Sequence, residues 1–313
     1  MITREKIPLM GRQPLATPPA SGGGCLIVVG IPFLLAGMAI ILGSMGGIPI
    51  KMKGGGAPPP SIVIGLTGFF FGLVGFGLMW SGVKSRIAFS RFSAAKSLNA
   101  NQPWEFDYAW DRTGCRLHKA KDAFGSFVAF IGMGLFLTPF NWWAFFSTQT
   151  HVVVIGVVGL FDLILLGILC HGVYTLLQAA KYGDPFLRFE KFPYYTGEKL
   201  SVSFEPSRPL GEFRSVEIIL RCVRVEKVEV RSSKGGRHTE DRCFQVYAEE
   251  LKIEQAGSMD NTALPLSFEV PINVAGTSLA EEPVRFWELQ IKADTPGIDF
   301  DAEFPLPIYS KSR

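Results

Sequence analysis

Residues 152–177 read VVVIGVVGLFDLILLGILCHGVYTLL, and this stretch decides the fold. Its 26 residues extend about 39 Å at a helical rise of about 1.5 Å per residue, which exceeds the apolar thickness of a bilayer. Asp162 is the only formal charge in the stretch. The chain before it is apolar and rich in glycine, whereas the chain after Lys181 alternates between polar and apolar residues. We therefore predict that the stretch is the last membrane helix and that it tethers a β domain.

The composition also indicates two parts with different surroundings. Of the 313 residues, 48% are hydrophobic and 19% are charged, which is too much charge for a chain that lies entirely in lipid. Residues 1–180 hold 13 Lys and Arg against 6 Asp and Glu, whereas residues 181–313 hold 18 against 22. Because the second part is slightly acidic, no nucleic acid is expected as a partner. The odd number of cysteines, 5, argues against a disulfide framework and favours a reducing compartment.

Three other apolar stretches lie at about residues 25–43, 61–80 and 124–146, and with 152–177 they predict a transmembrane domain of four helices over residues 25–180. Pro, Ser and Gly dominate the end of residues 1–24, which are predicted to be a disordered cytosolic tail. This tail carries 3 Lys and Arg and the loop 81–123 carries 8, against 2 in the connector 44–60 and none in 147–151. The positive-inside rule then places the tail, the loop and the β domain in the cytosol. The prediction is a multi-pass protein of the cell (inner) membrane with both termini cytoplasmic and with the lipid bilayer as a partner.

The second apolar stretch contains a stripe of glycines. Gly65, Gly68, Gly72 and Gly75 recur at spacings of three and four residues, so they lie along one side of a helix. Such a stripe lets a neighbouring helix approach closely, but glycine is also tolerated in any membrane helix. The sequence leaves both interpretations open.

Asp162 is the candidate polar site inside the membrane. It lies about 15 Å from the outer end of its helix, near the bilayer centre, where an unpaired carboxylate costs at least about 2.5–3.5 kcal/mol. The carboxyl group is therefore expected to face protein. Thr138, in the antiparallel third helix, lies at a similar depth and is the predicted partner of Asp162. The alternative is that Asp162 serves in a proton or ion relay.

Residues 181–313 are predicted to form an all-β domain, an antiparallel β-sandwich of about seven strands. The hydrophobic pattern there has a period of two in seven segments, separated by clusters of Gly, Pro, Ser and Asn. The polar run SSKGGRHTED joins the third and fourth segments and predicts a long hairpin tip. The alternation slips near Cys222 on the first arm and at Glu249 and Glu250 on the second. A turn near Gly236 would oppose residues 222 and 250, which predicts a β-bulge at that level.

Several of these segments are similar to those of a known fold. The run from Gly183 to Pro206, GDPFLRFEKFPYYTGEKLSVSFEP, resembles the first strands of arrestin-like sandwiches, and LPLSFEVP and WELQIKADTPGIDFDAEFPLPI resemble later strands. Pro103-Trp104 and the run 107–110, DYAW, resemble a short element in the middle loop of a family of bacterial membrane proteins that join a few spans to such a domain. The resemblance covers about residues 100–310. It implies an arrestin-like (immunoglobulin-like) sandwich that binds or scaffolds a protein partner, with one lobe instead of the usual two.

The sequence lacks the motifs that common mechanisms require. It contains no G-x-S-x-G, Walker A, H-E-x-x-H or G-x-G-x-x-G run. Cys115 and His118 have the C-x-x-H spacing of zinc ligands, but no second Cys/His pair lies nearby, which favours an ordinary polar pair in a loop. We therefore predict no catalytic, cofactor-binding or metal site.

Two groups of residues are candidate contacts with a partner. Lys234, Arg237 and His238 form a basic tip on an otherwise acidic domain, which is either a solvated loop or a contact for anionic headgroups or an acidic partner. Trp104 and Trp110 belong to a short aromatic segment, which is either anchored at the membrane interface or docked on the β domain.

The function expected from these features is non-enzymatic. A membrane domain would anchor a cytosolic β-sandwich that binds or scaffolds a protein partner. The alternative is a small transporter or membrane enzyme that uses Asp162. A transporter needs several intramembrane ionisable groups that face a cavity, whereas the predicted helices otherwise contain only His171.

Overall fold

A computed structural model of the chain contains two compact units. The helical unit comprises Pro19–Arg91 and Lys121–Leu176, and the β unit comprises Met1–Pro18, Phe92–Ala120 and Leu177–Arg313. The structure describes residues 2–3, 7–9, 12–15, 23–46, 61–99, 101–146, 152–231, 237–254 and 256–311. The β unit thus includes two segments, at the N-terminus and at residues 92–120, that the sequence assigned to the tail and to the membrane loop.

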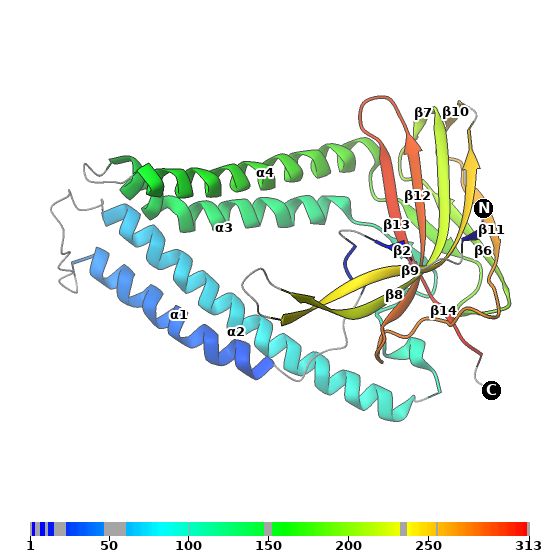
Figure 1. Cartoon of the computed structure of the whole chain (residues 1–313), viewed down its shortest axis with the longest axis horizontal. Helices are drawn as coiled ribbons and strands as arrows, with labels where there is room; N and C mark the ends of the chain where they lie inside the picture. Colours follow the sequence, from blue (N-terminus) through cyan, green and yellow to red (C-terminus); the bar gives the residue numbers. More distant parts are fainter. Residues whose placement is uncertain are drawn as a thin grey trace. The chain divides into compact units, whose positions relative to one another are not determined.

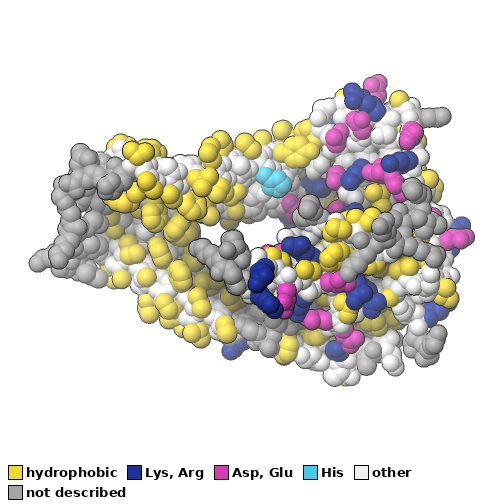
Figure 2. Space-filling view, in the orientation of Figure 1, with side chains coloured by type: hydrophobic (Ala, Val, Ile, Leu, Met, Phe, Trp, Pro, Cys, Tyr) yellow, Lys and Arg dark blue, Asp and Glu magenta, His cyan; other side chains and the backbone are white. Residues whose placement is uncertain are grey.

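Four long helices account for the four apolar stretches (Figure 1): α1 is Gly23–Ser44, α2 Ser61–Leu98, α3 Lys119–Phe146 and α4 Val152–Tyr182. Their most apolar windows have a mean hydropathy between 1.8 and 2.9, so each is long and apolar enough to cross a membrane. Hydrophobic side chains cover the surfaces of these helices, whereas charged side chains gather on the β unit (Figure 2). The prediction of four long apolar helices is confirmed.

Helix α2 is longer than predicted, because residues 81–98 continue it instead of starting a loop. From Val83 to Leu98 the chain contains no Gly or Pro, and a polar helical surface is compatible with helix formation once the apolar part has ended. The rest of the expected loop is also structured. It contains a 3₁₀ turn, Pro103–Glu105, and strand β3, Gly114–Arg116, before α3 begins.

Helices α1 and α2 pack antiparallel through buried glycines at a spacing of seven residues. The glycines that meet are 37 with 68, 30 with 75 and 23 with 82. A Cβ atom on Gly75 would lie 2.4 Å from the backbone nitrogen of Leu34, and one on Gly37 would lie 2.4 Å from that of Gly72. Backbone atoms cannot move aside as a side chain can, so only glycine fits. The packing interpretation is therefore confirmed for Gly68 and Gly75.

The β unit contains two main sheets and two short strand pairs. The first main sheet has the order β1–β9–β8–β12–β13, and β2 also pairs with β9. The second main sheet has the order β11–β6–β4–β3. In the two short pairs, β7 pairs with β10, and β5 pairs in parallel with β14. The remaining bounds are β1 Ile2–Thr3, β2 Ile7–Pro8, β4 Phe186–Phe189, β5 Tyr194–Tyr195, β6 Lys199–Glu205, β7 Gly211–Phe213, β8 Ser215–Arg231, β9 Arg237–Ile253, β10 Gly257–Met259, β11 Leu264–Glu269, β12 Arg285–Asp294, β13 Phe300–Leu306 and β14 Ile308–Tyr309. All seven predicted segments are strands, and both main sheets are antiparallel.

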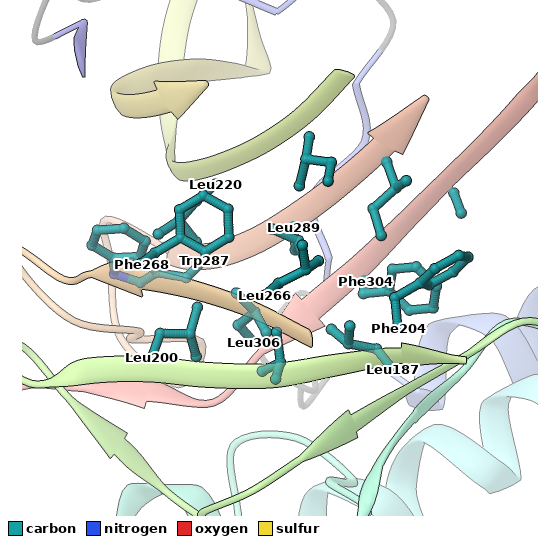
Figure 3. Packing of buried hydrophobic residues seen from close by; sticks show 14 of the residues in the cluster. Leu187, Leu200, Phe204, Leu220, Leu266, Phe268, Trp287, Leu289, Phe304 and Leu306 are labelled. Atoms are coloured by element: carbon teal, nitrogen blue, oxygen red, sulfur yellow. The ribbon is translucent and has the colours of Figure 1, made fainter. Parts of the chain in front are cut away.

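Side chains from both main sheets form one core (Figure 3). Trp287 and Leu289 from β12 and Phe304 from β13 meet Leu200 and Phe204 from β6, and all five are fully buried. On each strand these residues alternate with residues that point to the opposite face, as the period of two predicts. This alternation decides which charged side chains lie on the outer face of the first sheet.

The long hairpin β8–β9 contains the predicted bulge, but with a different partner residue. The register shifts between Cys222 and Val223, which lie opposite Tyr247 and Gln245, so Val246 is the extra residue. The predicted pairing of residues 222 and 250 is wrong because β9 already begins at residue 237. The polar residues 237–241, which were expected in the turn, belong to β9 instead, because an exposed two-stranded ribbon needs no apolar face.

The prediction that residues 1–24 form a disordered tail is wrong for part of this segment. β1 and β2 pair antiparallel with β9, with Thr3 opposite Ala248 and Ile7 opposite Gln245. The amide of Leu9 then donates a hydrogen bond to the carbonyl oxygen of Cys243 at 2.9 Å. Composition alone predicts disorder here, but the edge of β9 supplies backbone hydrogen bonds that a short isolated segment cannot make by itself.

Candidate functional site

Strand β9 is the outermost long strand of its sheet, and its outer edge is the first element of the site. The N-terminal arm, defined by the described residues 2–3, 7–9 and 12–15, pairs only with the middle of this edge. Among the residues that the structure describes, no strand pairs with the outer edge at 237–242 or at 251–253. An open edge presents backbone N–H and C=O groups that can accept another strand.

A pair of glutamates lies on the outer face of the same sheet. Glu288 of β12 is 1% exposed, and Glu303 of β13 is partly exposed. Arg221 of β8 lies directly opposite Glu288 in the strand register; its Nε donates to Glu288, and its Nη2 donates to Glu303 at 3.1 Å. We call Glu288 and Glu303 the carboxylate pair.

The arm supplies the second cation of the site. Arg12 donates from Nη1 to Glu303 and from Nη2 to Glu288, so it uses the carboxylate oxygens that Arg221 leaves free. The four side chains form a ring of two cations and two anions, and their formal charges cancel. Removing one partner of a buried ion pair commonly costs about 3–5 kcal/mol, because the remaining charge is left without compensation in a poorly solvated site. The site therefore favours a cation at the position of Arg12.

The arm also covers a second, smaller core on the outer face of the sheet. Leu9 and Leu15 pack from the arm and Tyr108 and Trp110 pack from the segment before β3. The buried residues of this core are Val223, Val225, Cys243, Leu279, Val284 and Phe286. The outer face thus has two covers that come from distant parts of the sequence.

The aromatic segment docks on the β unit through a network of hydrogen bonds. The hydroxyl of Tyr309 donates to Asp107 at 2.7 Å, and Nε1 of Trp110 donates to the oxygen of Tyr309 at 2.8 Å. The ring of Trp104 packs edge to face against Tyr309 and Tyr195, with centroid distances of 5.6 and 6.0 Å. Of the two interpretations of Trp104 and Trp110, the structure supports docking on the β domain.

Burial raises the pKa of Asp107 to about 6, although hydrogen bonds from Tyr309 and Trp110 act in the opposite direction. The unfolded value is about 3.9, so between these two values the folded state binds the additional proton. The contribution of Asp107 to the unfolding free energy is therefore greatest below about pH 4. It falls as the pH rises to about 6, by about 3 kcal/mol at most.

We expect Asp107→Asn to remove this pH-dependent contribution to the unfolding free energy. The difference in melting temperature between the variant and the wild type should shift in favour of the variant as the pH rises from 4 to 7, because only the wild type develops the buried charge. Thermal unfolding of the intact chain in detergent, followed by circular dichroism, measures the difference. Asp260→Asn, at an exposed position, is the control and should show no such trend. Parallel curves for Asp107→Asn and the wild type would contradict the raised pKa.

The predicted bond between Asp162 and Thr138 is wrong. Thr138 donates its hydroxyl to the carbonyl oxygen of Gly134 in its own helix at 2.8 Å, as threonine commonly does in helices. The partner of Asp162 is Asn141, which donates from Nδ2 to the carboxylate at 3.1 Å. Asn141 was visible in the sequence as a polar residue in an apolar stretch, and its side chain is long enough to reach the neighbouring helix.

The basic tip is less basic than its sequence indicates. Arg237 and His238 belong to β9 and are exposed; His238 lies 2.9 Å from Glu240, and Arg237 lies 3.8 Å from Glu229. Lys234 lies outside the described residues. The two described cations thus each have an acidic neighbour on the same hairpin, which weakens their attraction for anionic headgroups.

The structure places Cys115 and His118 in different surroundings. Burial raises the pKa of Cys115 to about 11, so it is a poor source of thiolate, and His118 lies 3.0 Å from Asp184. Within the described residues, no group of three or more His, Cys, Asp or Glu side chains could hold a metal ion.

The residues of the ion-pair ring were not identified from the sequence. Alternation along β12 places Glu288 on the face opposite the core, which for a sandwich strand normally means solvent. A charge on that face is buried only where another segment of the chain packs over it. Here that segment includes Arg12, which lies in a part of the chain predicted to be disordered. No signal in the sequence separates Arg221 from Arg224, because each is a charge between two apolar residues of β8.

No protein-family model and no curated protein matches the chain. Among solved structures, the chain is similar to Spo0M, a sporulation control protein from Bacillus subtilis, with 14% sequence identity and a TM-score of 0.29. The match covers 41% of this chain and 49% of Spo0M, so the chain spans about half the length of that protein. A similarity of this size says nothing about function, which has to be inferred from the site itself.

Proposed function

We propose that this chain is an integral membrane protein whose four helices anchor a cytosolic, arrestin-like β-sandwich, and that the sandwich binds a protein partner without catalysing a reaction. The observation that carries the proposal is the open outer edge of β9. Two short strands of the chain itself already add to the middle of this edge, which supports its ability to accept a strand. Strand addition provides affinity through backbone hydrogen bonds and needs no catalytic group.

Other observations support the parts of this proposal. The shared core of the two main sheets supports a sandwich. The length and hydropathy of the helices support insertion in a bilayer. The excess of Lys and Arg in residues 1–24 and 81–123 supports a cytosolic β domain under the positive-inside rule.

The experiment fixes the arm on the edge of β9 with a disulfide and measures whether the protein loses a partner. Ile7 and Gln245 lie opposite each other, so the double variant Ile7→Cys/Gln245→Cys can form a disulfide between β2 and β9. Partners are crosslinked in native membranes and co-purified with the oxidised and the reduced protein. We expect the oxidised double variant to lose a partner that returns on reduction, whereas the two single variants keep it under both conditions. A partner set that does not depend on the lock would contradict binding at this edge.

A proton or ion relay through Asp162 is a second candidate function. The observation that favours it is an intramembrane carboxylate whose neighbour, Asn141, has a buried side-chain oxygen with no hydrogen-bond partner among the described residues. Such a group is unusual in a purely structural contact.

Asp162→Asn separates a structural role from a relay. An asparagine at this position can still accept the hydrogen bond from Asn141, so we expect normal folding and normal cellular activity if the bond is structural. Folding is measured by thermal unfolding in detergent, and activity by complementation of the deletion strain. Asp162→Leu, which cannot accept the bond, is the control for a loss of packing. A well-folded Asp162→Asn protein that fails to complement would favour the relay.

A further inference from the structure

Three observations show that the described residues of the arm fill the site incompletely. Nε of Arg12 is buried and has no hydrogen-bond partner among the described residues. A cavity of about 670 Å³ lies beside Pro14, bounded by the base of the β8–β9 hairpin and by residues 282–284. Within the described residues, no strand pairs with the outer edge of β9 at 237–242 or at 251–253. A longer or better-fitting strand can therefore make contacts that the arm does not make.

The site selects for a cation at one position. Glu288 is almost fully buried while the arm covers it, and Arg12 and Arg221 are the two cations among the described residues that contact the carboxylate pair. Water reaches this carboxylate poorly, so a strand without a positive charge would leave one negative charge uncompensated. A guanidinium matches the two carboxylates better than an ammonium does, because its planar fork donates to both of them.

The arm also shows which neighbours of the cation matter. Leu9 and Leu15 lie three residues before and three residues after Arg12, and both pack on the second core. The spacing is Leu-x-x-Arg-x-x-Leu. An apolar side chain on each side of the arginine thus fixes its position relative to the carboxylate pair.

We propose that the outer edge of β9, the carboxylate pair and the second core form a binding site for a peptide segment that pairs with this edge, turns as the arm does between Leu9 and Arg12, and places an arginine flanked by apolar residues on the outer face, and that the arm is its exchangeable resting occupant. This inference rests on the proposed function only in assigning the site to a protein partner. The exchange of the arm itself can be tested without that partner.

The test uses the intact chain and a chain shortened by residues 1–15, both in the same detergent micelles. The probe is a fluorescent synthetic peptide of residues 1–15, and its anisotropy reports binding. We expect the peptide to bind the shortened chain. It should bind the intact chain much more weakly, because the attached arm competes at a high effective concentration.

Peptide variants test the need for the cation. Arg12→Gln should bind the shortened chain at least about tenfold more weakly, and Arg12→Lys should lie between this variant and the wild type. Gln13→Glu lowers the net charge of the peptide by the same amount at an exposed position and is the matched control, with affinity expected within about twofold of the wild type. Equal affinity of the Arg12→Gln and wild-type peptides would overturn the cation requirement.

A second pair of proteins keeps the test decisive if the shortened chain does not fold. The intact Arg12→Gln chain has a weakened arm, so it should bind the wild-type peptide more tightly than the unaltered chain does. No peptide binding by either altered chain, with the sheet signal in circular dichroism retained, would overturn the exchange. If the peptide binds but no partner depends on the disulfide of Ile7→Cys/Gln245→Cys, the proposed function is refuted and the exchange of the arm still holds.

Discussion

Arg221→Met should lower the unfolding free energy of the β unit by about 3 kcal/mol or more. Arg221 is one of the two cations that balance the carboxylate pair, and its side chain is 9% exposed. Methionine retains most of the aliphatic volume but removes the charge and both hydrogen bonds, so Glu288 and Glu303 share one remaining arginine. The loss is measured by chemical denaturation of the intact chain in detergent, followed by the sheet signal in circular dichroism.

The control for this prediction lies on the same strand. Arg224 is 44% exposed and pairs with Glu226 two residues further along β8 at 3.2 Å, so Arg224→Met should cost less than about 1 kcal/mol. The double variant Arg221→Met/Glu288→Met removes one charge of each sign and should recover at least half of the loss. Equal effects of Arg221→Met and Arg224→Met would show that the carboxylate pair is solvated and not held by the ring.

Gly75→Leu should separate helices α1 and α2. A Cβ atom on Gly75 already meets backbone atoms of Leu34 and Gly30 at 2.4 and 2.7 Å, and backbone cannot rotate away. Overpacking in a core costs about 1–3 kcal/mol when side chains can adjust, so the cost here should reach or exceed the upper end of that range. Because glycines hold this helix pair together, one large residue is enough to part it.

A disulfide between the two helices reports the separation. In Ser44→Cys/Gly65→Cys the Cβ atoms would lie 4.0 Å apart, within the range for a disulfide. We expect its rate of formation under mild oxidation to fall at least about tenfold when Gly75→Leu is added, in proportion to a cost above about 1.4 kcal/mol. Gly77→Leu is the matched control, since nothing lies within 4 Å of a Cβ atom at that position. A similar rate in both variants would contradict a close glycine contact.

The ion-pair ring connects the N-terminal arm to strands near the C-terminus. Arg12 lies in a segment predicted to be disordered, yet it contacts residues 276 and 291 positions away in the sequence. The same outer face receives Trp110 from a segment that precedes two of the apolar helices. The arm and the aromatic segment therefore belong to the β unit by their contacts, although the sequence places both outside the β region.

Some features of this protein follow from the sequence alone. The four apolar helices and the seven strands were predictable because each depends on a pattern within one segment, either a long apolar run or an alternation of period two. The bulge at Cys222 was predictable for the same reason, since a slip in alternation is local. Its partner was not, because the pairing of β8 with β9 depends on where the turn forms.

Only the tertiary structure decides which polar groups are buried. Glu288 and Arg221 alternate with core residues as exposed side chains would, but a cover that includes Arg12 of the arm lies on their face of the sheet. Likewise, depth along a helix suggested Thr138 as the partner of Asp162, but side-chain reach and the competing bond to Gly134 select Asn141. The sequence determines which face of each strand or helix a residue occupies, whereas burial depends on what packs against that face, and this comes from distant segments that no local pattern identifies.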